Sequence, residues 1–350
     1  MSLASEEYRT GSRAVRIASP AELRTELPLT QEGAANVAAA RSTLRDLLDG
    51  RDGRLLCVVG PCSIHDVVAA RTYANQLRAL AEELSESLFL VMRVYFAKPR
   101  TTIGWKGLIN DPALNGSFDI GAGLRLARHL LVDLADLGLP AGTEFLDPVT
   151  PAYLDDAVSW GAIGARTVES QLHREVASGL AMPVGFKNAT SGSVRVAVDA
   201  LLAAREPHRF VGTTAAGEVA VVATTGNPAT HLILRGSSDG TNYDSGSVAE
   251  AVAMLSERGL PPRLMVDCSH GNSGRDAARQ PEVALDVARR FAAGEPGLMG
   301  LMLESHLVGG RQSLAAGQPL RFGQSITDAC LDWETTASLL REVAGLVSSR

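Results

Sequence analysis

The strongest constraint on the fold is a regular alternation of short apolar runs with longer amphipathic segments. Segments with helical spacing, such as residues 67–84 and 247–259, lie between the runs. The runs are LLCVVG (55–60), LFLVMRVYF (88–96), PAGTEF (140–145), AIGARTV (162–168), PVGFKN (183–188), HLILRG (231–236), RLMVDCSH (263–270) and GLMGLMLES (297–305). Near-continuous apolar runs are typical of parallel strands covered on both faces. The pattern predicts an α/β fold, a (β/α)8 TIM barrel rather than a doubly wound sheet.

Two parts of the chain fall outside this alternation. Residues 1–50 are interpreted as an N-terminal extension, a polar start followed by a helix that has Thr30 as its N-cap and ends at Gly50. Residues 51–350 are interpreted as the catalytic barrel. The barrel includes an inserted β-hairpin at 208–226, where two β-rich pieces flank a turn that contains glycine.

Composition and charge exclude several classes of protein. Lys and Arg total 33 against 39 Asp and Glu, and aromatic residues make up 5%. Nucleic-acid surfaces need basic stripes and stacking aromatics, so we expect no nucleic-acid partner. The chain has no long apolar run and no apolar leader, so we expect a cytoplasmic protein without a membrane partner. Its four scattered cysteines favour reduced thiols over a disulfide scaffold.

A polar or ionisable residue stands at or just after the end of each apolar run. These residues are Cys62, Arg93, Glu144, Arg166, Lys187, Arg235, His270 and Glu304. A barrel gathers the carboxyl ends of its strands around one mouth, where barrel enzymes carry their active sites. A single charge at a strand end is usually just solvated. Eight in succession predict a functional site.

Four of these residues are cations, namely Arg93, Arg166, Lys187 and Arg235. Their convergence is unfavourable unless an anion is bound among them. Guanidinium groups bind phosphate and carboxylate in a bidentate manner, so a ligand with both groups suits this set. Lys98, Arg100 and Thr101, in the expected long loop 98–112, can bind a second phosphate.

The remaining residues at the ends of the apolar runs include potential metal ligands. Cys62, His270 and Glu304, with Asp328 after the last run, fit a divalent transition-metal site. The thiolate disfavours magnesium, whereas the oxygen ligands leave manganese, iron, zinc and cobalt open. Taken alone, Cys62 could be a buried apolar side chain and His270 a hydrogen-bonded core histidine.

The motifs around these residues resemble those of the class I 3-deoxy-D-arabino-heptulosonate 7-phosphate (DAHP) synthases of the long-chain type. The matching motifs are GPCSIHD (60–66), MRVYFAKPRTTIGWKGLINDP (92–112), SWGAIGARTVESQ (159–171), GFKN (185–188), ILRG (233–236), MVDCSHGNS (265–273), ESHLVGGRQS (304–313) and SITDACLDWE (325–334). They are long and specific. The resemblance implies a metal-dependent transferase that condenses phosphoenolpyruvate with erythrose 4-phosphate, the first step of the shikimate pathway to chorismate and the aromatic amino acids.

The resemblance also implies a role for each residue. The metal, with manganese favoured and iron, cobalt or zinc open, would be bound by Cys62, His270, Glu304 and Asp328. Phosphoenolpyruvate would contact Arg93, Lys98, Glu144, Arg166, Lys187 and Arg235, and erythrose 4-phosphate would contact Arg100 and Thr101. The expected catalytic residues are Lys98, His270 and Cys62. The sequence does not decide whether Lys98 or His270 moves protons.

Regulation and assembly are further expectations from the resemblance. An aromatic amino acid is the implied effector, bound near Pro148, Ala152 and the inserted hairpin. Gly212 resembles the tyrosine-sensitive branch, but Ala152 replaces a glutamine that is usual in feedback-sensitive members. We therefore expect weak or absent inhibition, as in a paralogue that serves secondary metabolism. Members form dimers and tetramers, so a homodimer or homotetramer is expected.

Three alternatives and one redox expectation stay open. A 3-deoxy-octulosonate 8-phosphate synthase is disfavoured by the KPRTT motif at 98–102. A Schiff-base aldolase with Lys187 as nucleophile would leave the metal set unexplained, and a non-catalytic regulatory paralogue would leave the intact site unexplained. Cys330 follows Asp328 by two residues, so we expect it to form a disulfide with Cys62 when the metal is lost.

Overall fold

The computed structural model describes residues 6–9, 11–100, 102–314 and 318–348. Its centre is a closed barrel of eight parallel strands in the order β10-β11-β12-β3-β4-β5-β6-β7. The strands are β3 (Leu55–Gly60), β4 (Leu88–Arg93), β5 (Ala141–Glu144), β6 (Trp160–Ile163), β7 (Val184–Lys187), β10 (Thr230–Leu234), β11 (Leu264–Asp267) and β12 (Leu298–Glu304). The predicted (β/α)8 barrel is confirmed, because strands that follow one another are neighbours and β12 pairs with β3 to close the ring.

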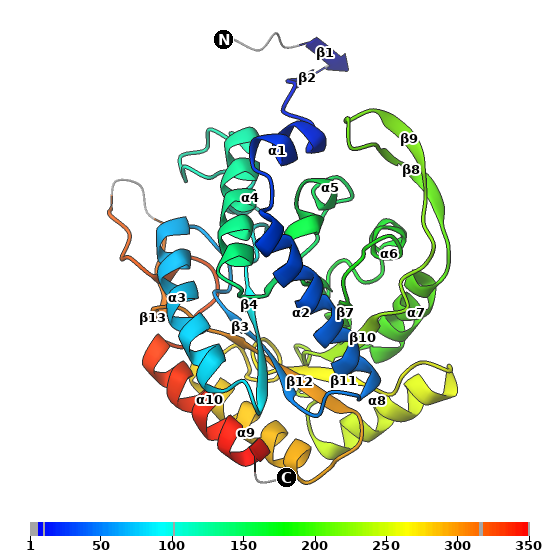
Figure 1. Ribbon diagram of the computed structural model, residues 1–350, viewed down its shortest axis with the longest axis vertical. Helices are drawn as coiled ribbons and strands as arrows, with labels where there is room; N and C mark the ends of the chain where they lie inside the picture. The colour runs from blue at the N-terminus through cyan, green and yellow to red at the C-terminus, as the bar shows by residue number, and fades with distance from the viewer. Residues whose placement is uncertain (1–5, 10, 101, 315–317, 349–350) are drawn as a thin grey trace.

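Helices cover the outside of the barrel (Figure 1). They are α3 (Val67–Glu83), α4 (Ile120–Asp136), α5 (Pro151–Leu154), α6 (Gln171–Ala177), α7 (Val194–Arg205), α8 (Ser245–Glu257), α9 (Gln280–Ala292) and α10 (Trp333–Ser348), with 3-10 turns at Asp155–Ala157 and Ala277–Arg279. The alternation within a strand decides which side chains face the helices. In β3, Cys57 and Val59 pack with helix residues, whereas Leu56 and Val58 belong to the barrel interior. Over the described residues, no helix is long and apolar enough to cross a membrane.

Helix α2 (Gln31–Asp49) closes the amino-terminal end of the barrel. Its predicted caps are confirmed, since the Thr30 side chain accepts from the Gly33 amide and Gly50 has a left-handed φ of 73°. Leu44, Leu47 and Leu48 join the cluster of barrel-interior side chains. Arginines on α2 donate to Val158 O and Ala181 O, which precede β6 and β7. With this end covered, the carboxyl end of the barrel is left to form a pocket.

The N-terminal region contains elements that the sequence analysis did not predict. Strands β1 (Glu6–Arg9) and β2 (Ser12–Ala14) form an antiparallel pair, and α1 (Pro20–Glu26) follows. A signal for α1 was available, because Ser19 and Glu22 have capping-box spacing and make both bonds of the box. The division into an extension 1–50 and a barrel 51–350 stays a prediction.

Two further strand pairs lie outside the barrel. β8 (Arg209–Thr213) and β9 (Val219–Ala223) form an antiparallel hairpin, as expected within 208–226. Figure 1 shows the hairpin reaching towards α1, and Ala21 N donates to Ala215 O in its turn at 2.8 Å. β13 (Val308–Arg311) pairs with β14 (Gln324–Ser325).

Most predicted strands end earlier than the sequence suggested, and three of them end three or more residues early. One of these is the run 88–96, in which β4 ends at Arg93. The run 162–168 was wrong as a strand, because β6 ends at Ile163 and a turn follows in which Thr167 N and Val168 N donate to Gly164 O. The run 263–270 was also too long, because β11 ends at Asp267. The residues beyond each strand end are therefore loop residues, which gives them more freedom to face a ligand.

Candidate active site

A cavity of about 840 Å³ opens at the carboxyl end of the barrel. This volume lies within the range of small-molecule sites. Predicted site residues that line it are Arg93, Lys98, Arg100, Glu144, Arg166, Lys187, Arg235, His270, Glu304 and Asp328. Cys62 is fully buried, and Thr101 lies outside the described residues. The structure thus brings nearly all of the predicted metal-binding and substrate-binding residues to one place.

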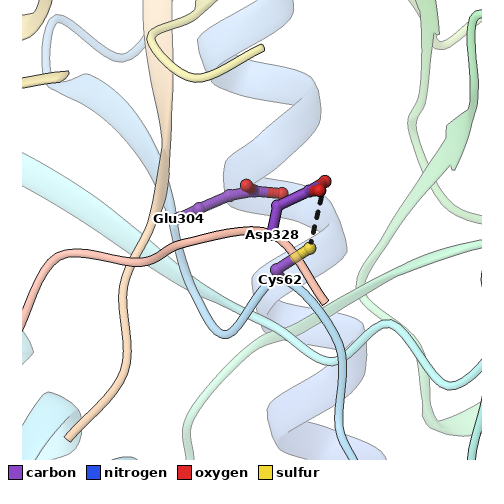
Figure 2. Close-up of side chains that lie close together, drawn as sticks. All are labelled: Cys62, Glu304 and Asp328. Carbon is purple, nitrogen blue, oxygen red and sulfur yellow. Dashed lines mark hydrogen bonds between the residues drawn. The ribbon is translucent and has the colours of Figure 1, made fainter. Parts of the chain in front are cut away.

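Three of the predicted metal ligands cluster closely. Ligand atoms of Cys62, Glu304 and Asp328 all lie within 4.8 Å of one another. Figure 2 shows the three side chains together, with the Cys62 thiol donating to Asp328 Oδ2 across 3.6 Å. Cys62 follows β3, and Glu304 ends the neighbouring β12, where it pairs with Gly60. The fourth predicted ligand is adjacent, since His270 Nε2 lies 3.8 Å from Glu304 Oε1.

The donor set fits a divalent transition metal. Burial and the nearby Glu304 and Asp328 raise the pKa of Cys62 to about 11, although Lys98 acts in the opposite direction. A bound cation would offset this penalty and hold the thiolate form. Sulfur, imidazole and carboxylate donors together favour manganese, iron, cobalt or zinc over magnesium.

The His270 loop is a tightly constrained turn. His270 has a φ of 55°, a region that non-glycine residues seldom adopt, and its carbonyl accepts from Arg275 N at 2.7 Å. The loop packs on the segment after β10, where a Cβ on Gly236 would lie 2.6 Å from the Gly271 backbone. Glycine at both places allows the loops that carry Arg235 and His270 to touch.

Cations line the side of the cavity next to this loop. Arg235 is 8% exposed, and burial followed by the like charges of Arg275 and Arg166 lowers its pKa, against the raising effect of Asp267. The Lys187 ammonium, also buried, donates to Asp267. Cations held this close favour binding of a multiply charged anion.

Glu144 stands at the cavity wall because a glycine leaves space for it. A Cβ at Gly164 would lie 1.9 Å from Glu144 Oε1, so a larger residue there would displace the carboxylate. Gly164 also begins the turn that carries Arg166. Gly164 therefore helps to position both Glu144 and Arg166, two of the predicted phosphoenolpyruvate contacts.

Lys98 and Arg93 lie between the other cations of the cavity and the cluster of Cys62, Glu304 and Asp328. Lys98 Nζ lies 3.1 Å from Cys62 Sγ, and Arg93 Nη2 lies 3.1 Å from Glu304 Oε1. Burial lowers the pKa of Lys98, but Cys62, Glu304 and other nearby acids raise it more, so its net pKa is above the ordinary value. Arg93 is fully buried, and its guanidinium carbon lies 4.0 Å from the centre of the Tyr95 ring.

Arginine side chains bond to backbone carbonyls of the loop after β4 and hold it at the site. Arg166 Nη1 donates to Pro99 O at 2.9 Å, and Arg100 Nε donates to Trp105 O at 2.8 Å. The segment 98–112 contains neither helix nor strand among its described residues, as the long-loop prediction required. Arg100 reaches the cavity from this loop.

Three charged residues of the site were missed from the sequence. Asp267 was hidden within an apolar run, although an acid three residues before His270 was a usable signal. Arg275 and Arg311 also line the cavity, from a loop and from β13. Arg311 lies in the motif 304–313, but neither residue stands at the end of an apolar run. Their positions follow from the tertiary fold.

The predicted effector residues lie away from this cavity. Pro148 and Val149 are exposed before α5, and Ala152 O accepts from Arg24 Nη2 of α1 at 2.6 Å. Gly212 is in β8, where a Cβ would lie 2.8 Å from Val222 Cγ2 of the paired strand. Helix α1 contacts both regions, since it also bonds the hairpin turn. Their role as an effector site stays a prediction.

Comparison with known proteins identifies the family. A sequence model of the DAHP synthetase I family matches residues 27–341. The chain belongs to the DAHP synthetase I family. The interpretation of the sequence as a class I DAHP synthase is thereby confirmed.

Curated relatives match almost end to end. The Phe-sensitive phospho-2-dehydro-3-deoxyheptonate aldolase of Escherichia coli K12 is 54% identical over 331 residues, or 95% of this chain and 94% of the relative. The Tyr-sensitive enzyme of the same organism is 54% identical over 328 residues, or 93% and 91%. Overall sequence identity therefore does not indicate whether this chain is more similar to the Phe-sensitive or to the Tyr-sensitive enzymes.

Solved structures agree with the fold. The phospho-2-dehydro-3-deoxyheptonate aldolase of Francisella tularensis SCHU S4 superposes with a TM-score of 0.94 at 45% identity, over 99% of both chains. The DAHP synthase of Thermotoga maritima, at 20% identity and a TM-score of 0.57, shares the barrel fold over 85% of this chain and 70% of its own.

Proposed function

We propose that this DAHP synthase family member condenses phosphoenolpyruvate with erythrose 4-phosphate in the cavity described above. The reaction joins C3 of phosphoenolpyruvate to the aldehyde carbon, adds water at C2 and releases phosphate by C–O cleavage. The observation that carries the proposal is the shared cavity, in which Lys187 and Arg235 lie beside the cluster of Glu304 and Asp328. Buried cations suit the enol phosphate, and the donor cluster suits a Lewis acid.

The chain's own residues hold the enol phosphate. Arg93, Arg166, Lys187 and Arg235 bind its phosphate and carboxylate and stabilise the charge that develops during the reaction. Arg100, with Thr101, binds the phosphate of the aldose. A divalent ion held by Cys62, His270, Glu304 and Asp328, manganese being favoured, supplies Lewis-acid polarisation of the aldehyde when bound. Lys98 reaches both subsites and can donate a proton to the developing alkoxide oxygen.

The geometry disfavours a Schiff base on Lys187. Its Nζ donates to the buried Asp267 carboxylate at 2.7 Å. Attack on a carbonyl carbon would require this nitrogen to leave its contact with Asp267. Borohydride reduction in the presence of both substrates should therefore leave no covalent adduct on the protein.

The substrate assignment is tested by comparing two aldose phosphates. The metal-loaded protein is incubated with phosphoenolpyruvate and either erythrose 4-phosphate or arabinose 5-phosphate, and released phosphate and the keto product are measured. We expect turnover with the four-carbon aldehyde and at least tenfold lower kcat/KM with the five-carbon one. The reverse preference would assign the octulosonate reaction, and no turnover with either would favour a non-catalytic paralogue.

We also propose an aromatic amino acid, with tyrosine favoured, as a weak effector. Gly212 supports tyrosine, and Ala152 removes an amide that a ligand could bond. The test titrates tyrosine and phenylalanine against activity in the parent and in Ala152→Gln. Weak inhibition in the parent that strengthens in the variant supports the proposal, whereas potent inhibition of the parent by tyrosine contradicts it.

For assembly, we propose a homodimer or homotetramer in the cytoplasm. The hairpin supports association, because Val211, Val219 and Val221 expose 75%, 80% and 73% of their surfaces. The free thiols of Cys57, Cys62, Cys268 and Cys330 support a reducing compartment. Light scattering after size exclusion tests the assembly, and a monomer would contradict it.

A further inference from the structure

Asp267 is a buried carboxylate at the end of β11 that contacts both halves of the site. It is 0% exposed. Its Oδ2 lies 2.7 Å from Lys187 Nζ and 2.9 Å from His270 Nδ1. Its Oδ1 accepts from Ser269 N at 3.0 Å and from Ser269 Oγ at 2.5 Å. A buried carboxylate is tolerated only when it is bonded in this complete way.

The contact with His270 decides which ring nitrogen can bind a metal. His270 Nδ1 lies 2.8 Å from Ser269 Oγ and 2.9 Å from Asp267 Oδ2. Because the Ser269 hydroxyl donates to Asp267 Oδ1, its oxygen can only accept from Nδ1–H. A proton on Nδ1 leaves the lone pair on Nε2, the nitrogen that lies 3.8 Å from Glu304 Oε1. Metal-binding histidines commonly donate their other N–H to a carboxylate, which fixes the tautomer and the ring orientation. Asp267 thus favours the tautomer of His270 in which Nε2 is free to bind a metal ion beside Glu304.

The contact with Lys187 fixes the second subsite. An ammonium has three donors, and Asp267 takes one of them. Lys187 also lines the cavity, so its other donors are available to an anionic ligand there. The same Oδ2 atom therefore orients a metal ligand and an anion-binding cation.

We propose that Asp267 is a positioning residue that couples the metal subsite to the phosphoenolpyruvate subsite. It does not touch the reacting atoms; it acts through His270 and Lys187. Loss of its charge weakens binding at both subsites at once, and binding of either ligand favours the arrangement that the other requires. This inference rests on the proposed function, because it takes His270 as a metal ligand and Lys187 as a phosphoenolpyruvate contact.

The test uses Asp267→Asn, whose NH2 group replaces one carboxylate oxygen and must face either Lys187 and His270 or the donors of Ser269. Asp276→Asn is the matched control, since Asp276 is an exposed acid near the same loop that caps a 3-10 turn. Mn²⁺ affinity is measured by electron paramagnetic resonance on chelator-treated protein, and phosphoenolpyruvate affinity by calorimetry with and without Mn²⁺. We expect the Kd for Mn²⁺ to rise 10- to 100-fold in Asp267→Asn, the Kd for phosphoenolpyruvate to rise about tenfold, and the mutual enhancement to disappear. The control should match the parent.

Each result decides between the two proposals. Unchanged affinities in Asp267→Asn, or loss at one subsite alone, overturn the coupling role. A parent protein that binds neither Mn²⁺ nor phosphoenolpyruvate overturns the proposed function instead. If Asp267→Asn does not fold, ¹⁵N-histidine spectra of the metal-free parent, with His270 assigned by His270→Gln, supply the decision. A proton on Nδ1 supports the inference, and a proton on Nε2 contradicts it.

Discussion

The ammonium nitrogen of Lys98 lies 3.1 Å from the sulfur of Cys62 and 3.2 Å from the carbonyl oxygen of the same residue. This lysine comes from the loop after β4, whereas the cysteine follows β3, so the contact joins that loop to the cluster of Cys62, Glu304 and Asp328. The positive charge of Lys98 lowers the pKa of the Cys62 thiol against the larger effect of burial. One lysine thus supports both the thiolate and the proposed proton transfer.

Replacement of Lys98 should weaken both metal binding through Cys62 and the proposed proton transfer. In Lys98→Met we expect kcat to fall by about 10²- to 10⁴-fold, the usual contribution of a positioned acid, and Mn²⁺ to bind more weakly because the thiol is harder to ionise. Steady-state kinetics and paramagnetic resonance measure the two effects. Lys106→Met, an exposed lysine of the same loop, is the control. A Lys98→Met enzyme with parental kcat would remove Lys98 from the chemistry.

The guanidinium of Arg235 should be needed for its shape as well as its charge. Arg235→Lys keeps the charge but loses the planar pair of donors that fits phosphate or carboxylate. We expect KM for phosphoenolpyruvate to rise at least tenfold, which initial-rate measurements at varied phosphoenolpyruvate detect. Arg258→Lys at the end of α8 should leave KM unchanged. Equal KM values in Arg235→Lys and the parent would contradict bidentate binding.

The fold should lose stability in mild acid through a buried histidine. His231 Nε2 accepts from Trp160 Nε1 at 3.0 Å, and burial lowers the pKa of His231 to about 4. An unfolded histidine titrates near 6.5. Between about pH 6 and pH 4 the unfolded chain therefore binds a proton on His231 that the folded chain does not bind. As the pH falls through this range, this group lowers the free energy of unfolding by about 1.4 kcal/mol per pH unit.

Denaturant unfolding at several pH values measures this loss. His231→Gln should have a shallower pH dependence than the parent by about one proton, while remaining less stable at pH 8 because the packing around Trp160 is altered. Above pH 7 both proteins should have a flat profile from this group. Parallel stability curves for parent and variant between pH 6 and pH 4 would show that His231 is protonated in the folded state.

Oxidation of the metal-free protein should involve Cys330. This thiol is free and buried, it donates to Asp328 O across 3.7 Å, and it is close enough to Cys62 to interact with it electrostatically. Two thiols that approach in this way can give a disulfide by losing two electrons and two protons to dioxygen, which removes a metal ligand. Under air without metal, Cys330→Ala should keep its Mn²⁺-restorable activity longer than the parent, and thiol titration should find two thiols lost in the parent. Equal inactivation rates would contradict the disulfide.

The barrel could be predicted from the sequence because its strands are covered on both faces. Runs such as 55–60 therefore read as unbroken apolar stretches, and strand β3 has these bounds. The residues at the strand ends also converged as expected, because closure of a parallel sheet brings carboxyl ends together regardless of loop detail. Residue identity and topology were sufficient there.

Other features depend on contacts that no local pattern records. Asp267 stood in a run that is typical of a core strand, and its contacts with Lys187 and His270 join β7 to the loop after β11. The left-handed His270 backbone shortens the predicted strand, but its stability comes from bonds across the loop such as that from Arg275 N. Arg311 reaches the cavity through the pairing of β13 with β14, two short strands without a sequence signal.

In the proposed site, buried cations hold an enol phosphate beside a divalent ion bound through Cys62. The most direct measurement removes metal exhaustively with a chelator and follows phosphate release from phosphoenolpyruvate and erythrose 4-phosphate before and after adding Mn²⁺. We predict that the parent loses turnover and regains it, whereas Cys62→Ala is not restored at the same Mn²⁺ concentration. Full turnover by thoroughly demetallated parent protein, or normal restoration of Cys62→Ala, would contradict a role for a metal ion bound through Cys62.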